Sequence, residues 1–208
     1  MSRLPSRRTV LSSVAAAMAV TTGGFERGSD ATETSPLESE TVAPDWYACA
    51  SVERPEPTAP ADDDALSPKP YPTRPSAFDP AGAYDRSTDS SLRDETVAYV
   101  TAFERAYRQN DVLDRYGSTA RTFEFRRTGY RTKILESSPI PAIMVAIRYD
   151  LRVGTQQSAT DPRDLWGVQT AYYVDEHIVL RARYGGVADT LSFEPDPRTH
   201  GELVACFD

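Results

Sequence analysis

The chain has 208 residues and a formal net charge of −8, from 23 basic and 31 acidic side chains. Such an acidic surface repels nucleic acids and anionic lipids, so DNA-binding, RNA-binding and peripheral-membrane roles are disfavoured. Once N-terminal segments that are not expected to fold are set aside, the length leaves room for one domain of about 100 to 150 residues.

Residues 1–27 are typical of a twin-arginine export signal. Arg7 and Arg8 lie in a charged leader, and a short apolar run rich in alanine and serine follows. This run is much shorter than the roughly 20 residues of a membrane-spanning helix. Ala17-Met18-Ala19 has the small-x-small pattern of a cleavage site. We expect cleavage near Ala19 and a mature chain that is secreted or associated with the cell envelope, without a transmembrane segment.

Lysine is rare in this chain. Lys69 and Lys133 are the only lysines, and the other 21 of the 23 basic residues are arginines. An acidic, lysine-poor chain with a twin-arginine signal resembles uncharacterised secreted proteins of halophilic archaea. In molar salt the Debye length falls to roughly 3 Å, so crowded carboxylates repel one another little. The alternative is an ordinary acidic protein from a GC-rich genome.

The two cysteines, Cys49 and Cys206, are expected to form a disulfide, the simplest use of two thiols in an exported chain. The alternative is a catalytic or metal-binding thiol.

Residues 28–88 are expected to precede the folded domain. The first part, to about Thr41, is rich in Ser, Thr, Glu and Asp and is predicted to be disordered. Eight prolines between Glu53 and Pro80 then favour an extended polyproline II segment. This segment is either a stalk or an arm that lies across the domain, and the expected disulfide favours the arm.

A single α+β domain is predicted over residues 89–208. Val97, Val100, Phe103 and Tyr107 recur at intervals of three and four, which predicts an amphipathic helix that ends at Gly117. The charged residues expected on its opposite face are Arg93, Glu95, Glu104, Arg105 and Arg108.

After Gly117 the apolar residues alternate with polar ones, which predicts strands. The clearest strand runs from Ile143 to Val153, and Asp175-Glu176 is expected to be a tight turn. Further strands are expected at 123–126, 168–174 and 178–184, with a short last strand at 203–207. Because one face of each strand is polar, about four strands should form a one-sided antiparallel meander covered by the helix.

One helix followed by about four antiparallel strands resembles the element order of cystatin-like folds and of a reduced nuclear-transport-factor-2-like cone. The resemblance covers residues 90–185 and rests on element order. Inhibitory cystatins carry a Gln-Val-x-Ala-Gly-type hairpin, whereas the corresponding hairpin here reads Gly154-Thr155-Gln156-Gln157-Ser158. No inhibitory residues are therefore carried over.

The candidate binding residues are Arg148, Arg152, Arg181 and Arg183. Within each pair the spacing is even, so both side chains point to the same side of their strand. If the register places both pairs on one face, they form a cationic patch suited to an envelope protein or an anionic glycan. The alternative is a solvated ladder of cross-strand pairs with Asp150 and Glu124.

The sequence contains no nucleophile elbow, phosphate loop or dinucleotide fingerprint, and His177 and His200 have no partner at metal-ligand spacing. We therefore predict a non-catalytic binding or structural module of the cell envelope, without a cofactor or metal. The alternative is a small-ligand-binding or enzymatic domain with a pocket between helix and sheet.

Overall fold

The structure is a computed structural model, and its described residues belong to one compact unit. They are residues 41–43, 46–78, 89–135, 142–156, 163–185 and 190–207. The predicted export signal at residues 1–27, with Arg7 and Arg8, lies outside the described residues, as does the predicted disordered segment up to residue 40.

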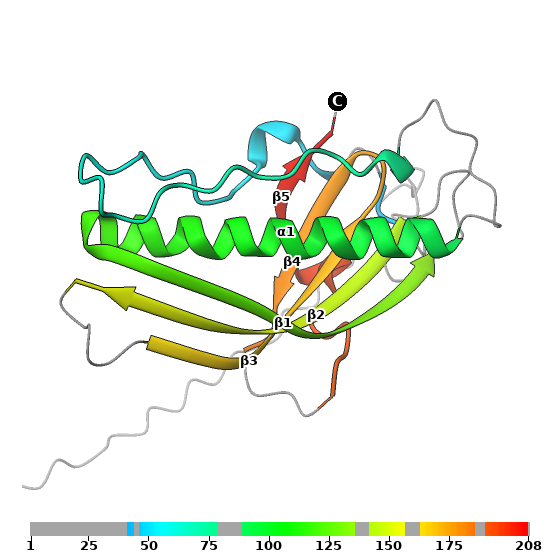
Figure 1. The fold of residues 1–208 in the computed structure, drawn as a ribbon. Helices are drawn as coiled ribbons and strands as arrows, with labels where there is room; N and C mark the ends of the chain where they lie inside the picture. Colours follow the sequence, from blue (N-terminus) through cyan, green and yellow to red (C-terminus); the bar gives the residue numbers. More distant parts are fainter. Residues whose placement is uncertain are drawn as a thin grey trace, which may run out of the picture. The chain divides into compact units, whose positions relative to one another are not determined.

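The domain has the predicted α+β architecture, with one long helix packed on a five-stranded antiparallel sheet (Figure 1). The sheet is a meander in the order β1-β2-β3-β4-β5, so each strand pairs with its neighbour in the chain. The elements are α1 (Asp89–Tyr116), β1 (Ala120–Leu135), β2 (Ala142–Thr155), β3 (Arg163–Val174), β4 (Ile178–Arg183), α2 (Pro197–His200) and β5 (Glu202–Cys206). The last strand lies where the sequence predicts a short one.

Helix α1 ends at the residue that the sequence indicates. Gly117 follows Tyr116 with a φ of 51°, in the left-handed region that glycine adopts without steric cost. A short 3₁₀ turn, η5 (Gly117–Thr119), then leads into β1. The predicted end of the helix is thus confirmed.

The main hydrophobic core lies between α1 and the side of the sheet that faces it, which we call the inner face. Val100 and Phe103 of α1 are fully buried there against alternate residues of β2. The ring of Phe103 meets Tyr172 of β3 edge-on, with the ring centroids 6.1 Å apart. The β2 residues in this core are Ile143, Val145, Ile147, Tyr149 and Leu151, as their alternation predicts.

The proline-rich segment lies along α1 as an arm, on the side of the helix away from β1 (Figure 1, cyan). Residues 66–76 of the arm contact the helix in antiparallel order. The pairs are Leu66 N to Ala120 O (2.9 Å) just beyond the helix end, Lys69 N to Asn110 Oδ1 (2.8 Å), the rings of Tyr71 and Phe103 (4.9 Å), and Ser76 Oγ to Glu95 Oε2 (2.8 Å). Helix α1 is therefore covered by the arm as well as by the sheet.

The predicted disulfide is present between Cys49 and Cys206, with 5.5 Å between the Cα atoms. Just beyond Cys49, the Glu53 N–H donates to the Leu203 carbonyl over 2.9 Å. The start of the arm is therefore attached to β5 both covalently and by a backbone hydrogen bond.

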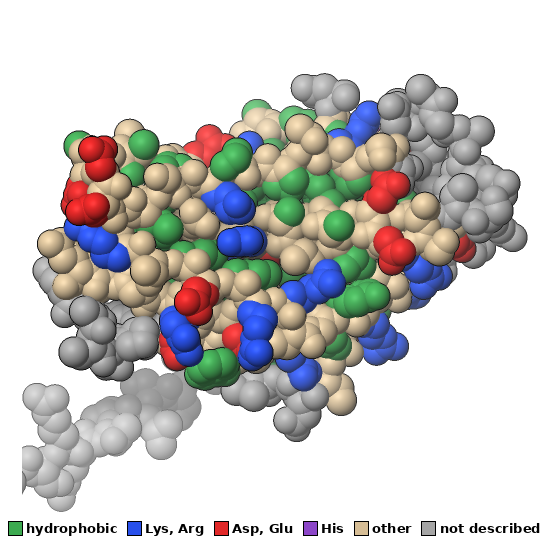
Figure 2. Space-filling model, in the orientation of Figure 1, with side chains coloured by type: hydrophobic (Ala, Val, Ile, Leu, Met, Phe, Trp, Pro, Cys, Tyr) green, Lys and Arg blue, Asp and Glu red, His purple; other side chains and the backbone are tan. Residues whose placement is uncertain are grey.

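We call the side of the sheet away from α1 the outer face. The sequence predicts that this face is polar and exposed to solvent, and this is wrong for the part of it where β2 begins. Met144, Tyr173 and Leu180 form a second buried cluster there, covered by Val42 and Phe193. The outer positions of β2 are apolar at its beginning and charged towards its end, so only the charged end faces solvent. On the face that carries α1, the described basic and acidic side chains are interspersed (Figure 2).

Candidate functional site

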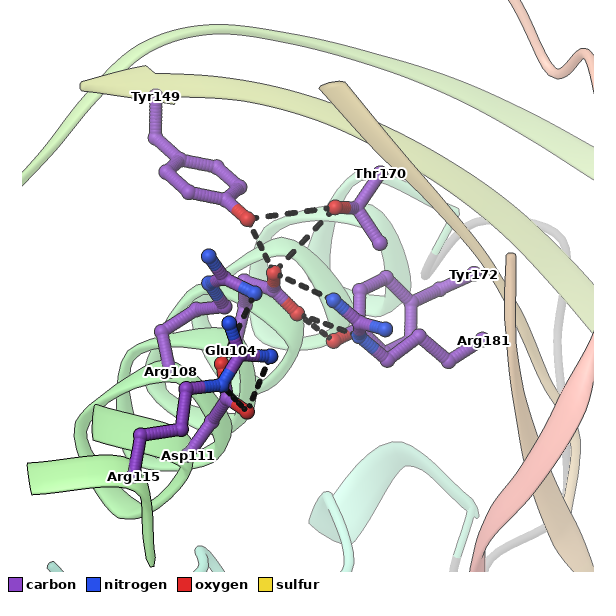
Figure 3. Close-up of polar contacts among 8 residues, drawn as sticks. All are labelled: Glu104, Arg108, Asp111, Arg115, Tyr149, Thr170, Tyr172 and Arg181. Carbon is purple, nitrogen blue, oxygen red and sulfur yellow. Dashed lines mark hydrogen bonds and ion pairs between the residues drawn. The ribbon is translucent and has the colours of Figure 1, made fainter. Parts of the chain in front are cut away.

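A buried carboxylate lies between α1 and the inner face of the sheet. Glu104 is fully buried, and its side chain points from α1 towards Tyr149, Thr170, Tyr172 and Arg181 (Figure 3). Arg181 binds it side-on, with Nε 2.8 Å from Oε2 and Nη2 3.0 Å from Oε1. The hydroxyls of Tyr149 and Tyr172 each donate to one carboxylate oxygen, and Thr170 Oγ1 lies 3.3 Å from Oε1.

The strand register explains why these groups meet. Tyr172 of β3 lies opposite Arg181 of β4, so both side chains leave the sheet on the same face. Thr170 is two residues before Tyr172 and shares that face. Glu104 reaches them from α1 because it lies four residues after Val100, within the stripe that faces the sheet.

Each charge of the buried pair stabilises the other. Burial opposes ionisation of Glu104, but Arg181 and the hydroxyl donors outweigh it and hold the pKa of the carboxyl below its ordinary value. Burial likewise opposes the charge of Arg181, and Glu104 outweighs this and raises the pKa of the guanidinium. Burial raises the pKa values of Tyr149 and Tyr172, so both remain neutral donors.

The hydrogen-bonding capacity of Glu104 is fully used. Five donors converge on its two oxygens, so the carboxylate has no remaining site at which to take a proton from a substrate. The arrangement suits a structural role, because it joins α1 to β2, β3 and β4 through one charged group. It also fixes the position of Arg181.

A pocket of about 300 Å³ lies beside this pair, with Arg181 in its wall. It is bounded by the C-terminal half of α1 and by β4, α2 and β5. Arg181 also lies over the ring of Tyr107, with its guanidinium carbon 4.0 Å from the ring centroid. The residues that line the pocket are Tyr107, Arg108, Asp111, Arg115, Arg181, Arg183, Pro195, His200 and Glu202.

Ion pairs hold part of the pocket wall in place. Asp111 contacts Arg108 over 3.3 Å and Arg115 over 2.8 Å. Arg108 is only 5 % exposed, and its Nε is a buried donor that has no hydrogen-bond partner among the described residues. A buried donor of this kind calls for a bound group or an ordered water. Arg183, at the end of β4, is exposed at the pocket.

The four predicted binding arginines do not share one face. Arg183 lies opposite Thr170 and Arg181 opposite Tyr172, so both arginines point to the inner face and line the pocket. Arg148 and Arg152 alternate with the inner-face residues of β2, so they lie on the outer face. The register thus answers the question that the sequence leaves open: the four arginines form no single patch, because β3 separates β2 from β4 and the two pairs have opposite orientations.

On the outer face the predicted cross-strand ladder is present. Arg152 lies between Glu124 of β1, at 3.5 Å, and Asp164 of β3, at 3.3 Å. Asp150 pairs with Arg126 of β1 over 2.8 Å. The alternative interpretation of this charged surface, as a solvated ladder, is thus confirmed for Arg152 and Asp150.

The histidines differ in their surroundings. His177 is exposed in the β3–β4 turn, and its Nε2 lies 3.4 Å from Glu176 Oε1. His200 is at the end of α2 and lines the pocket, with Nδ1 2.7 Å from Thr199 Oγ1. Among the described residues, no group of three or more His, Cys, Asp and Glu is arranged to hold a metal ion.

Glu104 and Arg108 were expected on the solvent face of α1, and both are buried. The expectation is wrong because charge was taken as the sign of exposure. Their spacing carries the opposite signal: Glu104 lies four residues after Val100 and three before Tyr107, and Arg108 follows four residues later. A charged residue at an apolar position of a helix indicates a buried partner.

Comparison of the chain with protein-family models, with curated proteins and with solved structures finds no match. Within the described part of the chain, none of the helices has the length and apolar character needed to cross a membrane. The pocket and the buried pair are therefore the observations on which a function can be based.

Proposed function

We propose that this protein is an exported, non-catalytic binding module that takes a small oxyanion into the pocket between α1, β4 and β5. The observation that carries the proposal is that four arginines, Arg108, Arg115, Arg181 and Arg183, line one pocket. Of these, Arg183 has an exposed guanidinium at the pocket.

The charge of the pocket supports an anionic ligand. Four arginines line it, against the carboxylates of Asp111 and Glu202, and Glu104 behind the wall neutralises Arg181. The pocket is thus slightly positive in a chain whose formal net charge is −8. Guanidinium groups bind planar carboxylates and tetrahedral oxyanions through paired N–H donors, so either chemistry fits.

The size of the pocket limits the ligand. A volume of about 300 Å³ is at the lower end of the range for small-molecule sites. It suits a single carboxylate or sulfate group with a short carbon skeleton. An anionic glycan that projects one such group into the pocket presents the same chemistry.

Two observations favour binding over catalysis. The Glu104 carboxylate is saturated by donors and so is poorly suited to act as a general base. In addition, the described residues that line the pocket include no serine, threonine, cysteine or lysine to serve as a nucleophile. His200 is the one described lining residue of a type that commonly transfers protons near neutral pH.

The Cys49–Cys206 disulfide supports a site of action outside the cytoplasm, because such bonds persist in oxidising compartments. Export by the twin-arginine route, through Arg7 and Arg8, is part of the proposal. An envelope-associated or secreted location would bring the pocket into contact with anionic metabolites and glycans.

The test is a titration with sodium sulfate at constant ionic strength, set with sodium chloride and followed by backbone amide chemical shifts. We expect saturable shifts centred on Arg183 and His200. Arg183→Gln should weaken sulfate binding about tenfold, or roughly 1.4 kcal/mol, near the lower value for a hydrogen bond to a charged group. Arg105→Gln is the matched control, because Arg105 is exposed on α1 and does not line the pocket. Linear, non-saturating shifts, or equal affinity in both variants, would contradict the proposal.

A further inference from the structure

A tryptophan is exposed on β3, at the end of the sheet where the outer face is charged. Trp166 is 60 % exposed, the largest exposed fraction among the large hydrophobic residues that the structure describes. An exposed indole offers a flat apolar face beside one N–H donor, and tryptophan is enriched at binding interfaces for this reason. Neither the oxyanion pocket nor the hydrophobic core uses this side chain.

The backbone around Trp166 is held by a β-bulge. The register between β2 and β3 shifts at this point, and Gly167 has a φ of 63°. The Gly167 N–H donates to Asp150 Oδ1 over 3.0 Å, and Asp150 also accepts from Arg126 over 2.8 Å. The backbone hydrogen bond to Gly167 is the main reason why the pKa of Asp150 lies below its ordinary value. The indole is therefore presented from a well-anchored strand.

Trp166 borders a hollow of about 510 Å³ on this part of the sheet. Side chains from β1 and β2, most of them charged, form the rest of its rim. The lining residues are Glu124, Phe125, Arg126, Asp150, Leu151, Arg152 and Trp166.

The charges around the hollow are matched within the protein. Arg126 is paired with Asp150, and Arg152 lies between Glu124 and Asp164. Two cations and two anions line the hollow, and Asp164 adds one further anion beside Arg152, so the hollow does not select a strongly charged ligand. The carboxylates retain lone pairs and the guanidiniums retain N–H groups, and both can bind hydroxyls.

We propose that the Trp166 hollow binds a neutral saccharide. A pyranose ring has an apolar face of C–H groups that can lie on an indole, and a rim of hydroxyls that both donate and accept hydrogen bonds. The hollow offers this combination: one exposed aromatic surface beside paired acids and guanidiniums, with little net charge. This site is separate from the oxyanion pocket, and neither proposal depends on the other.

The experiment uses the full disulfide-bonded protein and a panel of neutral hexasaccharides built from glucose, mannose or galactose. The chain has two tryptophans, Trp46 and Trp166, so the Trp46→Phe variant leaves Trp166 as the only indole that reports. We expect a saturable change in tryptophan fluorescence with at least one sugar of the panel. Calorimetry with that sugar should show binding weakened roughly tenfold or more by Trp166→Ala, as is typical for a truncated aromatic anchor.

The controls separate this proposal from the previous one. Trp46→Ala should bind the sugar like the wild type, although Trp46 is also exposed, at 49 %. Trp166→Ala should still bind sulfate in the oxyanion pocket, and Arg183→Gln should still bind the sugar. Absence of saturable binding across the panel, unchanged sugar affinity in Trp166→Ala, or tighter binding of a sulfated hexasaccharide at Trp166 would overturn the proposal.

Discussion

The buried Glu104–Arg181 pair predicts a large loss of stability when only one of its charges is removed. In Glu104→Gln the side chain keeps its shape, but the guanidinium, whose side chain is 4 % exposed, remains charged in the core without a counter-ion. The amide nitrogen of glutamine also brings N–H donors to a site where five donors already converge. The substitution should therefore be far more costly than a surface one.

Removing one partner of a buried ion pair typically costs about 3 to 5 kcal/mol. That is a large part of the roughly 5 to 15 kcal/mol by which a native domain is stable. With a urea m-value of about 2 kcal/mol/M, the unfolding midpoint should fall by about 1.5 to 2.5 M. The assay is equilibrium unfolding in urea at neutral pH and fixed salt, with the disulfide intact.

Two further variants make the test specific. Glu124→Gln removes an acid that is 70 % exposed and 3.5 Å from Arg152, and should cost less than about 1 kcal/mol. Adding Arg181→Met to Glu104→Gln removes the unpaired charge, so the double variant should be more stable than the sum of the single losses predicts, by about 1 to 3 kcal/mol. If Glu104→Gln unfolds at the same urea concentration as Glu124→Gln, the reasoning is refuted.

Four other outcomes are expected. Folding lowers the pKa of Glu104 below its ordinary value of 4.5. The ionised carboxylate therefore contributes its full stabilisation above pH 4.5 and loses it as the pH falls through the folded-state pKa. Acid unfolding of the wild type should accordingly be steeper than that of Glu104→Gln. Burial raises the pKa of Tyr149 above its ordinary value of 10.0. The neutral hydroxyl therefore contributes its full stabilisation below pH 10.0 and loses it as the pH rises towards the folded-state pKa. Above pH 10.0 the phenolate absorbance of the native protein should stay below that of the unfolded chain. Reduction of the Cys49–Cys206 disulfide should lower the free energy of unfolding by about 2 to 5 kcal/mol, and an unchanged urea midpoint would contradict this. Replacing Arg7 and Arg8 by lysine should leave precursor in the cytoplasm, and undiminished secretion would rule out the twin-arginine route.

Much of the fold could be predicted because its signals are local. The three- and four-residue spacing of Val97, Val100, Phe103 and Tyr107 defines α1, and Gly117 marks its end. Strict alternation defines β2, whose inner residues from Ile143 to Leu151 are in the main core. The disulfide could be predicted because the chain has only two cysteines.

The candidate site could not be predicted in the same way, because it depends on partners that are distant in the sequence. Glu104 and Arg181 are 77 residues apart, and only the register of β3 against β4 brings Arg181 to the inner face. The same register separates Arg148 from Arg181. The outer apolar cluster was missed because Val42 and Phe193, which cover Met144, come from segments outside the strands.

The disulfide also determines how the domain carries mechanical load. Cys49 precedes nearly all of the described structure, and Cys206 is at the end of the last strand. A force that pulls on the chain before Cys49 and after Cys206 passes directly through the S–S bond, so the helix, the sheet and most of the arm are not stretched. Reduction transfers that force to the hydrogen bonds between β4 and β5 and to the contacts of the arm. The domain should therefore resist stretching in an oxidising environment and yield to it once the bond is reduced.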